Sequence, residues 1–416
     1  MNMMRAARLH EIGGSFSIDQ IPIPTPGRHE VRVKVEACGL IPNLRNVVTH
    51  FPSWYPFLPL PALPATFGLD SAGTVTAVGE GVTAWKAGDR VYVNPGIGCG
   101  ECRYCRQGEP TRCDSYTFMG YFGFGPGSQA IFERYPHAGY GEYLTAPAAN
   151  LVRLPDTLSS AQAARLGYLG TAYSAIRKSA LRPGQSVLIL GATGTLGVGA
   201  TLLALAFGAA RVLVVARDRT ALERLVALAP QRVVPVVLGE GGIAEQARRH
   251  LPDGVDAMLD TLGAKAPAEL SVDAMGAVAR GGRIVQIGGV AGPIPIDPHP
   301  FMCAQLQYIG SLWFTPTEGD ELVGMILPRR MGEAQPAVDI DFQQVPCGTK
   351  GTTQQLTLTN VGNAAFDFTG SLQGADASFF QVDAPTGTPR APRYFPHASR
   401  QSSSESPSSM RTIARG

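Results

Sequence analysis

Hydrophobic and polar residues alternate in short runs along most of the first 150 residues. The stretches VRVKVEA at 31–37, GTVTAVG at 73–79 and DRVYVNP at 89–95 are typical of β-strands, and Gly and Pro residues separate them at strand-like intervals. This pattern predicts a β-rich, barrel-like domain over residues 1–150.

The pattern changes near residue 151, where apolar runs begin to alternate with helix-like segments. The runs that predict strands read SVLIL, RVLVV, RVVPVV, AMLD, RIVQIG and YIGSLWF. Alternation of strands and helices is typical of a doubly wound parallel sheet. The chain is therefore predicted to be of the α/β class, with a Rossmann sheet over residues 151–327.

A third pattern begins near Pro328. The segment 335–384 shows period-two alternation with Thr, Asn and Gly turns, whereas 385–416 is rich in Pro, Ser and Arg and has little to bury. We expect another β segment over 335–384 and a disordered tail over 385–416.

The stretch 186–210 carries no charge and is long enough to span a bilayer. We interpret it as a strand, a glycine turn and a helix, because three glycines interrupt it and another strand follows. The net charge of +2 gives no global field to attract nucleic acid or an anionic membrane. The N-terminus lacks an apolar run with a cleavage site, which favours the cytoplasm.

Three glycines at spacing three follow the first strand of the second domain and open a helix. Such a turn brings the first helical amides close to a pyrophosphate, although close packing alone would also require glycine. Further strand-helix units in register favour a dinucleotide site. Its predicted residues are Gly191, Thr193, Gly194, Thr195, Leu196 and Gly197.

The next strand ends in VVARDR, without an acidic residue directly after the strand. Ala216 flanked by Arg217 and Arg219 would accept a 2′-phosphate, which favours NADP(H) over NAD(H). Asp218 keeps NAD(H) possible, and the arginines could instead be a solvated helix start.

Four of the seven cysteines lie between residues 99 and 113, with the spacing C-x2-C-x2-C-x7-C. Four thiolates close a tetrahedral zinc shell, so such an ion would stabilise the loop and leave no open position for catalysis. An iron-sulfur cluster or a coincidental spacing are the alternatives, and clustered thiolates suit a reducing compartment. The predicted ligands are Cys99, Cys102, Cys105 and Cys113.

The order of these features resembles the zinc-type alcohol dehydrogenases of the medium-chain dehydrogenase/reductase superfamily. The resemblance covers residues 4–326 and includes the stretches PTPGRHEVRVKVEACG, GTVTAVGEGVTAWKAGDRV and GYGEYLTAPAANLVRLPDTLSSAQAA. It implies a GroES-like catalytic domain with a zinc lobe at 95–114, a Rossmann domain, and a cleft between the two. It also implies a small-molecule substrate and a homodimer or homotetramer.

The chain departs from this family at the catalytic zinc. Where the resemblance implies a cysteine, a histidine and a second cysteine as ligands, the sequence has Ile41, Leu69 and Tyr168. The positions of the family's proton relay hold Asn43 and Asn46, and an amide does not relay protons readily. The sequence therefore predicts one structural zinc per chain and hydride transfer without a catalytic zinc.

Several side chains are candidates for the remaining chemistry. We expect Tyr168 to face the cleft as proton donor, although it could also serve only in packing. Asp70, which could orient a donor, and Asn43, at the relay position, are further candidates. His50 is a candidate for the substrate entrance, and we interpret Cys38 as a small buried hydrophobic residue. The apolar stretch HFPSWYPFLPLP favours a hydrophobic substrate.

Two other functions also fit the sequence. Loss of the catalytic ligands and of the family's C-terminal return would suit a non-catalytic nucleotide-binding or scaffold protein. Substitute ligands such as Cys38, His50 or Asp70 would suit an ordinary zinc alcohol dehydrogenase. The segment 335–384 resembles the opening strands of a bacterial Ig-like β-sandwich at about half its length, which suggests a gene fusion or a frame disruption.

Overall fold

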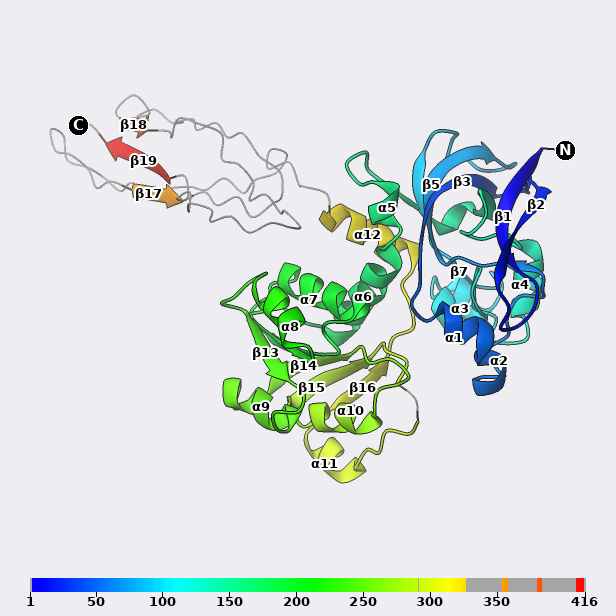
Figure 1. The fold of residues 1–416 in the computed structure, drawn as a ribbon. Coiled ribbons are helices and arrows are strands. Elements are labelled where there is room, and N and C mark those ends of the chain that lie inside the picture. Colours follow the sequence, from blue (N-terminus) through cyan, green and yellow to red (C-terminus); the bar gives the residue numbers. More distant parts are fainter. Residues whose placement is uncertain (1, 291, 327–353, 358–379, 384–408, 415–416) are drawn as a thin grey trace. The chain divides into compact units, whose positions relative to one another are not determined.

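The computed structural model describes residues 2–290, 292–326, 354–357, 380–383 and 409–414. Residues Met1–Gly324 form one compact unit and Met325–Gly416 form a second. Figure 1 shows that the first unit has a β-rich N-terminal lobe and an α/β lobe built around a parallel sheet.

The N-terminal lobe is built mainly from antiparallel strands. Its strands are β1 (Met3–Leu9), β2 (Phe16–Pro22), β3 (Glu30–Gly39), β4 (Ala65–Thr66), β5 (Asp70–Val78), β6 (Arg90–Val93), β7 (Gly96–Ile97), β8 (Thr117–Phe118), β9 (Tyr143–Pro147) and β10 (Leu151–Arg153). The largest sheet has the order β10-β6-β5-β3-β9, and smaller sheets have the orders β2-β1-β4 and β7-β8. The strands β3, β5 and β6 confirm the three predicted from the alternating pattern.

Short helices fill the turns of this lobe. They are α1 (Leu44–Thr49), α2 (Phe51–Trp54), α3 (Arg103–Arg106), α4 (Ser128–Arg134) and α5 (Ser160–Ala163), with 3₁₀ turns at Pro110–Arg112 and Ala148–Asn150. Alternate residues such as Val31, Val33 and Val75 are fully buried in the core of the lobe. One face of the main sheet is thereby covered, as the period-two pattern requires.

The α/β lobe is a doubly wound parallel sheet. Its elements are α6 (Leu166–Ser179), β11 (Ser186–Leu190), α7 (Thr195–Ala206), β12 (Arg211–Ala216), α8 (Arg219–Val226), β13 (Val233–Val237), α9 (Ile243–His250), β14 (Val255–Asp260), α10 (Ala268–Met275), β15 (Val278–Gln286), α11 (Pro298–Cys303) and β16 (Gln307–Gly310). The strand order is β13-β12-β11-β14-β15-β16, which confirms the predicted Rossmann sheet. Helices α6, α7 and α8 cover one face, and α9 and α10 cover the other (Figure 1).

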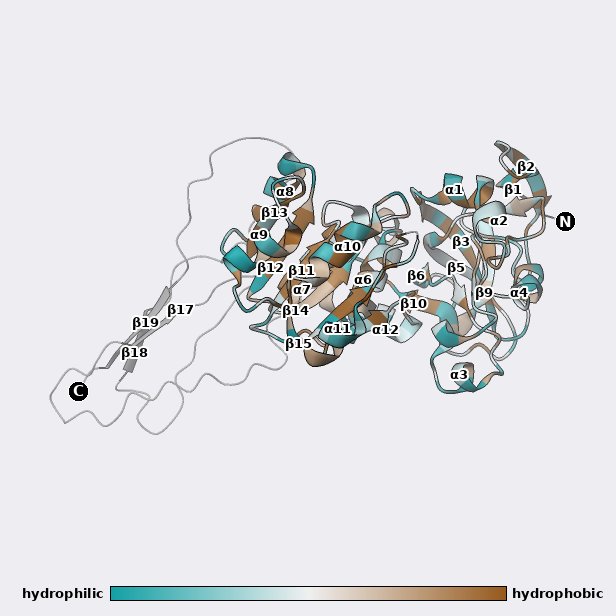
Figure 2. Cartoon of the chain, turned by 90° about the horizontal axis from the view of Figure 1, so that it is seen from below, coloured by the Kyte–Doolittle hydropathy of each residue, from teal (hydrophilic) through white to brown (hydrophobic). Residues whose placement is uncertain are grey.

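The strands of this sheet are almost wholly apolar because helices cover both faces. Figure 2 shows these hydrophobic strands between helices that carry hydrophilic residues. The strand order reverses between β11 and β14, whose register pairs Leu190 with Asp260. Ligands of such sheets bind at the carboxyl ends of the strands beside this reversal.

The last predicted strand is shorter than expected. β16 ends at Gly310, although the apolar run continues to Phe314. Trp313 and Phe314 are instead buried against the N-terminal lobe, where both make hydrogen bonds with Asn94. The helix α12 (Pro316–Ile326) follows.

Among the described residues, no helix has both the length and the apolar character needed to cross a bilayer. The uncharged stretch 186–210 contains β11 and the 12-residue helix α7, as the glycine pattern predicted.

In the second unit the structure describes three short strands. They are β17 (Gln354–Thr357), β18 (Phe380–Asp383) and β19 (Ser409–Ala414), which form an antiparallel sheet in the order β17-β19-β18. Most of 335–384 and 385–416 lies outside the described residues, so the Ig-like segment and the disordered tail stay predictions.

Candidate functional site

The glycine turn after β11 has the geometry of a pyrophosphate cradle. Gly191 has a φ of 80°, a conformation that favours glycine. A Cβ at Gly197 would lie 2.4 Å from the Gly191 carbonyl oxygen, so only glycine lets α7 begin this close to the strand. The first backbone amides of α7 therefore lie at the end of β11, where they could donate hydrogen bonds to the pyrophosphate of a dinucleotide.

The other predicted residues of this turn lie around the start of α7. Gly194 is the N-cap of α7, Thr195 is its exposed first residue, and Thr193 and Leu196 are half-buried. The turn thus brings together the residues that the sequence predicted for the cofactor.

Two of the residues after β12 make interactions that the sequence did not predict. Ala216 is buried at the strand end, and Arg217 is exposed. The Asp218 carboxylate accepts a hydrogen bond from the Ala221 amide at 3.0 Å and caps α8. Arg219 forms an ion pair with Glu240, which the sequence analysis did not identify.

The four cysteines converge into one cluster. Their Sγ atoms all lie within 4.8 Å of one another, compared with about 3.8 Å between sulfurs in a tetrahedral zinc site with 2.3 Å bonds. Backbone amides surround the sulfurs: the Cys99 amide donates to Cys113 Sγ at 3.4 Å, and the Cys102 amide donates to Cys99 Sγ at 3.3 Å. This donor set fits a structural zinc ion.

The thiols of this cluster differ in acidity. Hydrogen bonds from the backbone of Glu101 and Cys102 lower the pKa of Cys99 to about 7, whereas burial raises the pKa of Cys105 to about 12. Burial also raises the pKa of Cys113. Four thiolates at neutral pH therefore require a cation among them.

The three positions that the resemblance assigns to the catalytic ligands hold Ile41, Leu69 and Tyr168. Leu69 is buried, Ile41 is half-buried, and Tyr168 is half-buried in the first turn of α6. Burial, followed by the nearby Asp70 carboxyl, raises the pKa of Tyr168 to about 12. The phenol therefore stays protonated at neutral pH and can donate a hydrogen bond.

Asp70 is a buried carboxyl at the start of β5, only 1% exposed. The Tyr92 hydroxyl donates to its Oδ1 at 2.8 Å. Burial raises the pKa of Asp70 to about 7, although Tyr92, Arg165 and the Gly167 backbone lower it. A Cβ at Gly167 would lie 2.0 Å from Asp70 Oδ1, so the carboxyl lies directly against the first turn of α6.

Two further tyrosines lie on either side of the segment before Leu69. The Gly68 amide donates to the Gly120 carbonyl at 3.1 Å, and the Tyr140 amide donates to the Phe67 carbonyl at 2.8 Å. These bonds bring Tyr121 and Tyr140 beside this segment, and burial, with a smaller contribution from Tyr168, raises the pKa of both. The sequence analysis missed them, because only contacts over more than 40 residues reveal them.

Asn43 and Asn46 form a hydrogen bond with each other in place of a proton relay. Asn46 Nδ2 donates to Asn43 Oδ1 at 2.8 Å, so the Asn43 side chain makes no capping bond to α1. Burial raises the pKa of Tyr121, and the nearby Asn43 side chain partly offsets this rise. Asn43 therefore lies close to both Asn46 and Tyr121.

The side chains suggested as substitute zinc ligands have other surroundings in the structure. Burial raises the pKa of the Cys38 thiol to about 12, so this thiol stays neutral. His50 is exposed and its ring stacks on Trp54 at 4.7 Å. Within the part of the chain that the structure describes, the cysteine cluster is the only group of three or more His, Cys, Asp or Glu side chains whose ligand atoms meet.

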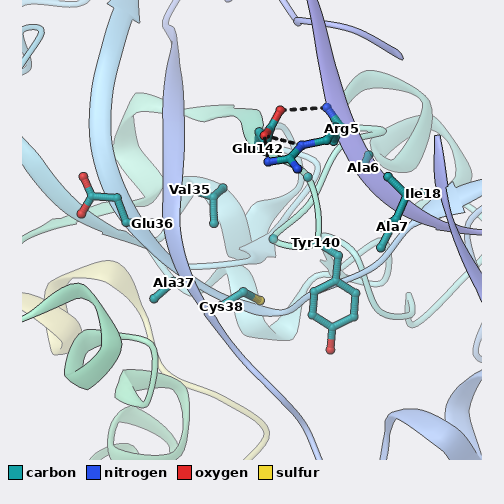
Figure 3. A pocket seen from close by; sticks show the side chains of 12 residues that line it. Arg5, Ala6, Ala7, Ile18, Val35, Glu36, Ala37, Cys38, Tyr140 and Glu142 are labelled. Carbon is teal, nitrogen blue, oxygen red and sulfur yellow. Dashed lines mark hydrogen bonds and ion pairs between the residues drawn. The ribbon is translucent and has the colours of Figure 1, made fainter. Parts of the chain in front are cut away.

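Figure 3 shows a pocket of about 350 Å³ in the N-terminal lobe. Cys38 and Tyr140 line it, and Arg5 pairs with Glu142 at 2.7 Å on its wall. All of its lining residues lie between positions 5 and 142, and none comes from the α/β lobe.

Comparison with known proteins agrees with this geometry. Residues 27–156 match the family of alcohol dehydrogenase GroES-like domains, and residues 195–327 match the family of zinc-binding dehydrogenases. An NAD-dependent alcohol dehydrogenase of Saccharolobus solfataricus is 30% identical, over 74% of this chain and 85% of that protein. A human quinone oxidoreductase is 29% identical, over 76% and 82% of the two chains.

Solved structures share the fold of the first unit. A zinc-binding dehydrogenase of Sinorhizobium meliloti bound to NADP has a TM-score of 0.66 and 25% identity, over 80% of this chain and 92% of that one. The glycine cradle, the sulfur cluster and these matches together show that the chain belongs to the zinc-type alcohol dehydrogenases of the medium-chain dehydrogenase/reductase superfamily, a family of NAD(P)-dependent oxidoreductases.

Proposed function

We propose that this protein transfers hydride between NADP(H) and a hydrophobic carbonyl compound, alcohol or activated C=C compound, with a structural zinc and without a catalytic zinc. Residues 1–150 would form the catalytic domain and 151–327 the nucleotide-binding domain. Cys99, Cys102, Cys105 and Cys113 would hold the structural ion.

One observation carries the proposal: the three ligand positions of the family hold Ile41, Leu69 and Tyr168. Neither an aliphatic side chain nor a phenol of high pKa is a typical zinc ligand. The carboxyl that follows Leu69 is engaged by Tyr92 and by the start of α6. A Lewis acid would otherwise supply several kcal/mol of charge stabilisation, so hydrogen-bond donors must supply it here.

Protein donors are available at this position. The nicotinamide, when bound, supplies or accepts the hydride. Tyr168 stays protonated, and it would donate a hydrogen bond or a proton to the substrate atom that gains negative charge. Asp70 would fix the first turn of α6, and Asn43 would orient Tyr121 in the same region.

Reduction of a conjugated C=C bond suits such a site. The hydride adds to the carbon that is conjugated to a carbonyl, and the neighbouring carbon receives a proton from a hydroxyl or water. The negative charge is spread over the carbonyl, so the reaction needs less stabilisation than an isolated alkoxide. The name of the human relative, a quinone oxidoreductase, supports testing quinones as well.

A chain of aromatic contacts favours an apolar substrate. Phe51 contacts Phe122 at 5.3 Å between ring centroids, Phe122 contacts Phe118 at 5.6 Å, and Phe118 contacts Trp313 at 4.8 Å. Phe57 nearby leaves 66% of its surface exposed. Phe51, Phe118 and Trp313 are buried, so these rings form a packed apolar layer between the start of α2 and the α/β lobe, and the exposed Phe57 is the ring of this region that a hydrophobic substrate could contact.

Zinc content tests the metal assignment. Purified protein should contain about one zinc ion per chain, because one closed sulfur cluster accounts for it. Mutation of Cys102 to Ser should abolish this zinc. Two ions per chain would contradict the proposal and support a zinc alcohol dehydrogenase with substitute ligands.

Substrate oxidation and reduction test the activity. Enals, enones, cinnamyl-type aldehydes and quinones should accelerate NADPH oxidation, measured by absorbance. Tyr168→Phe should lower kcat by about 100-fold, the usual size of general acid catalysis, with an unchanged Kd for NADPH. Tyr143→Phe, at another half-buried tyrosine, should change neither. Tight NADPH binding without turnover of any of these compounds would favour a scaffold instead.

The oligomeric state is part of the proposal. β16 is the last strand of its sheet among the described residues, and Tyr308 on it is 37% exposed. Such an edge can extend a sheet across a subunit interface, which supports the proposed homodimer or homotetramer. Light scattering of the purified protein should give twice or four times the chain mass of 43.9 kDa.

A further inference from the structure

The carboxyl ends of β12 and β13 lie side by side at the position where Rossmann folds read the adenosine ribose. Ala216 pairs with Val237 in the parallel register, and the Leu238 amide donates to the Ala216 carbonyl at 3.0 Å. The loop after β13 is therefore joined to the segment that discriminates between a 2′-hydroxyl and a 2′-phosphate.

This loop directs a carboxylate towards that segment. Glu240 lies between Gly239 and Gly241, whose φ angles of 97° and 111° fall where only glycine is favoured. The loop turns back towards α8, and the Glu240 carboxylate forms the ion pair with Arg219 at the first position of this helix.

The ion pair changes the charge that a 2′-phosphate would meet. Asp218 is engaged in capping α8, and Arg219 is engaged with Glu240. Arg217 is exposed and forms no ion pair with any residue that the structure describes. A 2′-phosphate would thus meet one free guanidinium, and it would have to displace the Glu240 carboxylate to gain a second.

We propose that Glu240 is a specificity-determining residue of the cofactor site, which weakens NADP(H) binding by holding Arg219 and thereby reduces the discrimination against NAD(H). The inference rests on the proposed use of NADP(H). Glu240 acts on the 2′-phosphate alone, because NAD(H) has no group that needs Arg219.

Equilibrium titration of the full chain with NADPH and NADH, followed by nicotinamide fluorescence, tests this role. Glu240→Gln should lower the Kd for NADPH by about three- to tenfold, because an exposed ion pair and one nearby repulsive charge contribute modestly. The Kd for NADH should change by less than about twofold. Glu245→Gln is the matched control, because Glu245 pairs with Arg249 at 3.3 Å and its loss changes the net charge equally.

The double variant Arg219→Gln, Glu240→Gln separates the ion pair from simple charge removal. Without Arg219, the gain in NADPH affinity from Glu240→Gln should shrink to about twofold or less, the size expected for a screened exposed charge. A Glu240→Gln effect no larger than that of Glu245→Gln, or a gain of full size without Arg219, would overturn the inference. A wild-type preference for NADH would contradict the proposed cofactor and not the role of Glu240, since the change in the Kd ratio is measured in either case.

Discussion

A single buried carboxyl at Asp70 makes stability depend on pH. Burial raises its pKa from 3.8 to about 7, so the folded protein binds this proton more tightly than the unfolded chain does. The contribution of this group to stability is therefore most favourable below about pH 4, falls as pH rises towards 7, and is constant above. We expect Asp70→Asn to be more stable than wild type at pH 8 by about 2–4 kcal/mol, with the difference vanishing near pH 4.

Chemical denaturation of both proteins between pH 4 and pH 8 measures this difference. Asp253→Asn serves as the control because Asp253 is exposed. A stability difference between Asp70→Asn and wild type that is the same at both pH values would contradict the role assigned to burial.

The second prediction at the scale of a residue concerns Tyr121. Its hydroxyl lies beside Asn43 in the region of Tyr168. We expect Tyr121→Phe to lower kcat by about tenfold. This is less than the effect of Tyr168→Phe, because the substitution removes the Tyr121 hydroxyl and leaves Tyr168, the proposed proton donor, in place. Steady-state kinetics with NADPH and an enone measure it. An unchanged kcat would show that Tyr121 serves only in packing.

Single residues also show how far the sequence predicts this site. Ile41, Leu69 and Tyr168 could be predicted to replace the family's zinc ligands because each is adjacent to a motif along the chain. Tyr92 and Tyr121 could not, because they reach Asp70 and Asn43 through pairing of distant strands and turns. The Glu240 carboxylate was missed for the same reason, since parallel pairing of β12 with β13 is what brings it to Arg219.

At the scale of an element, the segment that carries the four cysteines has two short helices without buried residues, and we propose that a zinc ion stabilises it. The helix α3 is a single turn, and its N-cap is the predicted ligand Cys102, which accepts a hydrogen bond from the Cys105 amide. Burial of Cys105 disfavours its thiolate without a cation. A structural zinc can contribute about 10 kcal/mol or more of apparent binding energy. We therefore expect Cys102→Ser to lose its zinc and unfold at a clearly lower temperature.

Calorimetry and zinc analysis of the same samples check this prediction. Cys303→Ser provides the control, because Cys303 is exposed at the end of α11 and lies outside the cluster. Retention of one zinc per chain by Cys102→Ser would contradict the ligand assignment.

Elements differ in how well their patterns predict them. The strands of the parallel sheet were predicted because covering both faces demands continuous apolar runs. The run that ends at Phe314 was predicted to be a strand throughout, yet it leaves the sheet after Gly310. An apolar side chain is buried equally well in a sheet or in a lobe interface, so hydropathy alone does not separate the two.

At the scale of the whole first unit, one buried amide joins the two lobes. Asn94 is 1% exposed; its Nδ2 donates to the Phe314 carbonyl at 3.1 Å, and its Oδ1 accepts from Trp313 Nε1 at 3.0 Å. The Tyr92 ring, which holds Asp70, also stacks on Phe314 at 6.2 Å. Phe314 therefore contacts both Tyr92, which binds the Asp70 carboxyl beside α6, and Asn94, which joins the lobes.

We expect Asn94→Ala to destabilise the protein by about 2–4 kcal/mol, because it leaves buried polar groups of Trp313 and Phe314 without partners. Trp313→Phe removes the indole donor and also leaves a small cavity, because Trp313 is buried and Phe is smaller. In the double variant the two losses should not add, with a coupling of at least about 0.5 kcal/mol, because the Trp313 contact is already lost in Asn94→Ala. Urea denaturation of the four proteins measures this cycle. Additive losses would mean that the Asn94–Trp313 hydrogen bond does not stabilise the joint between the lobes, and that the cost of Asn94→Ala comes from its other bonds, such as that to the Gly96 amide at 3.0 Å.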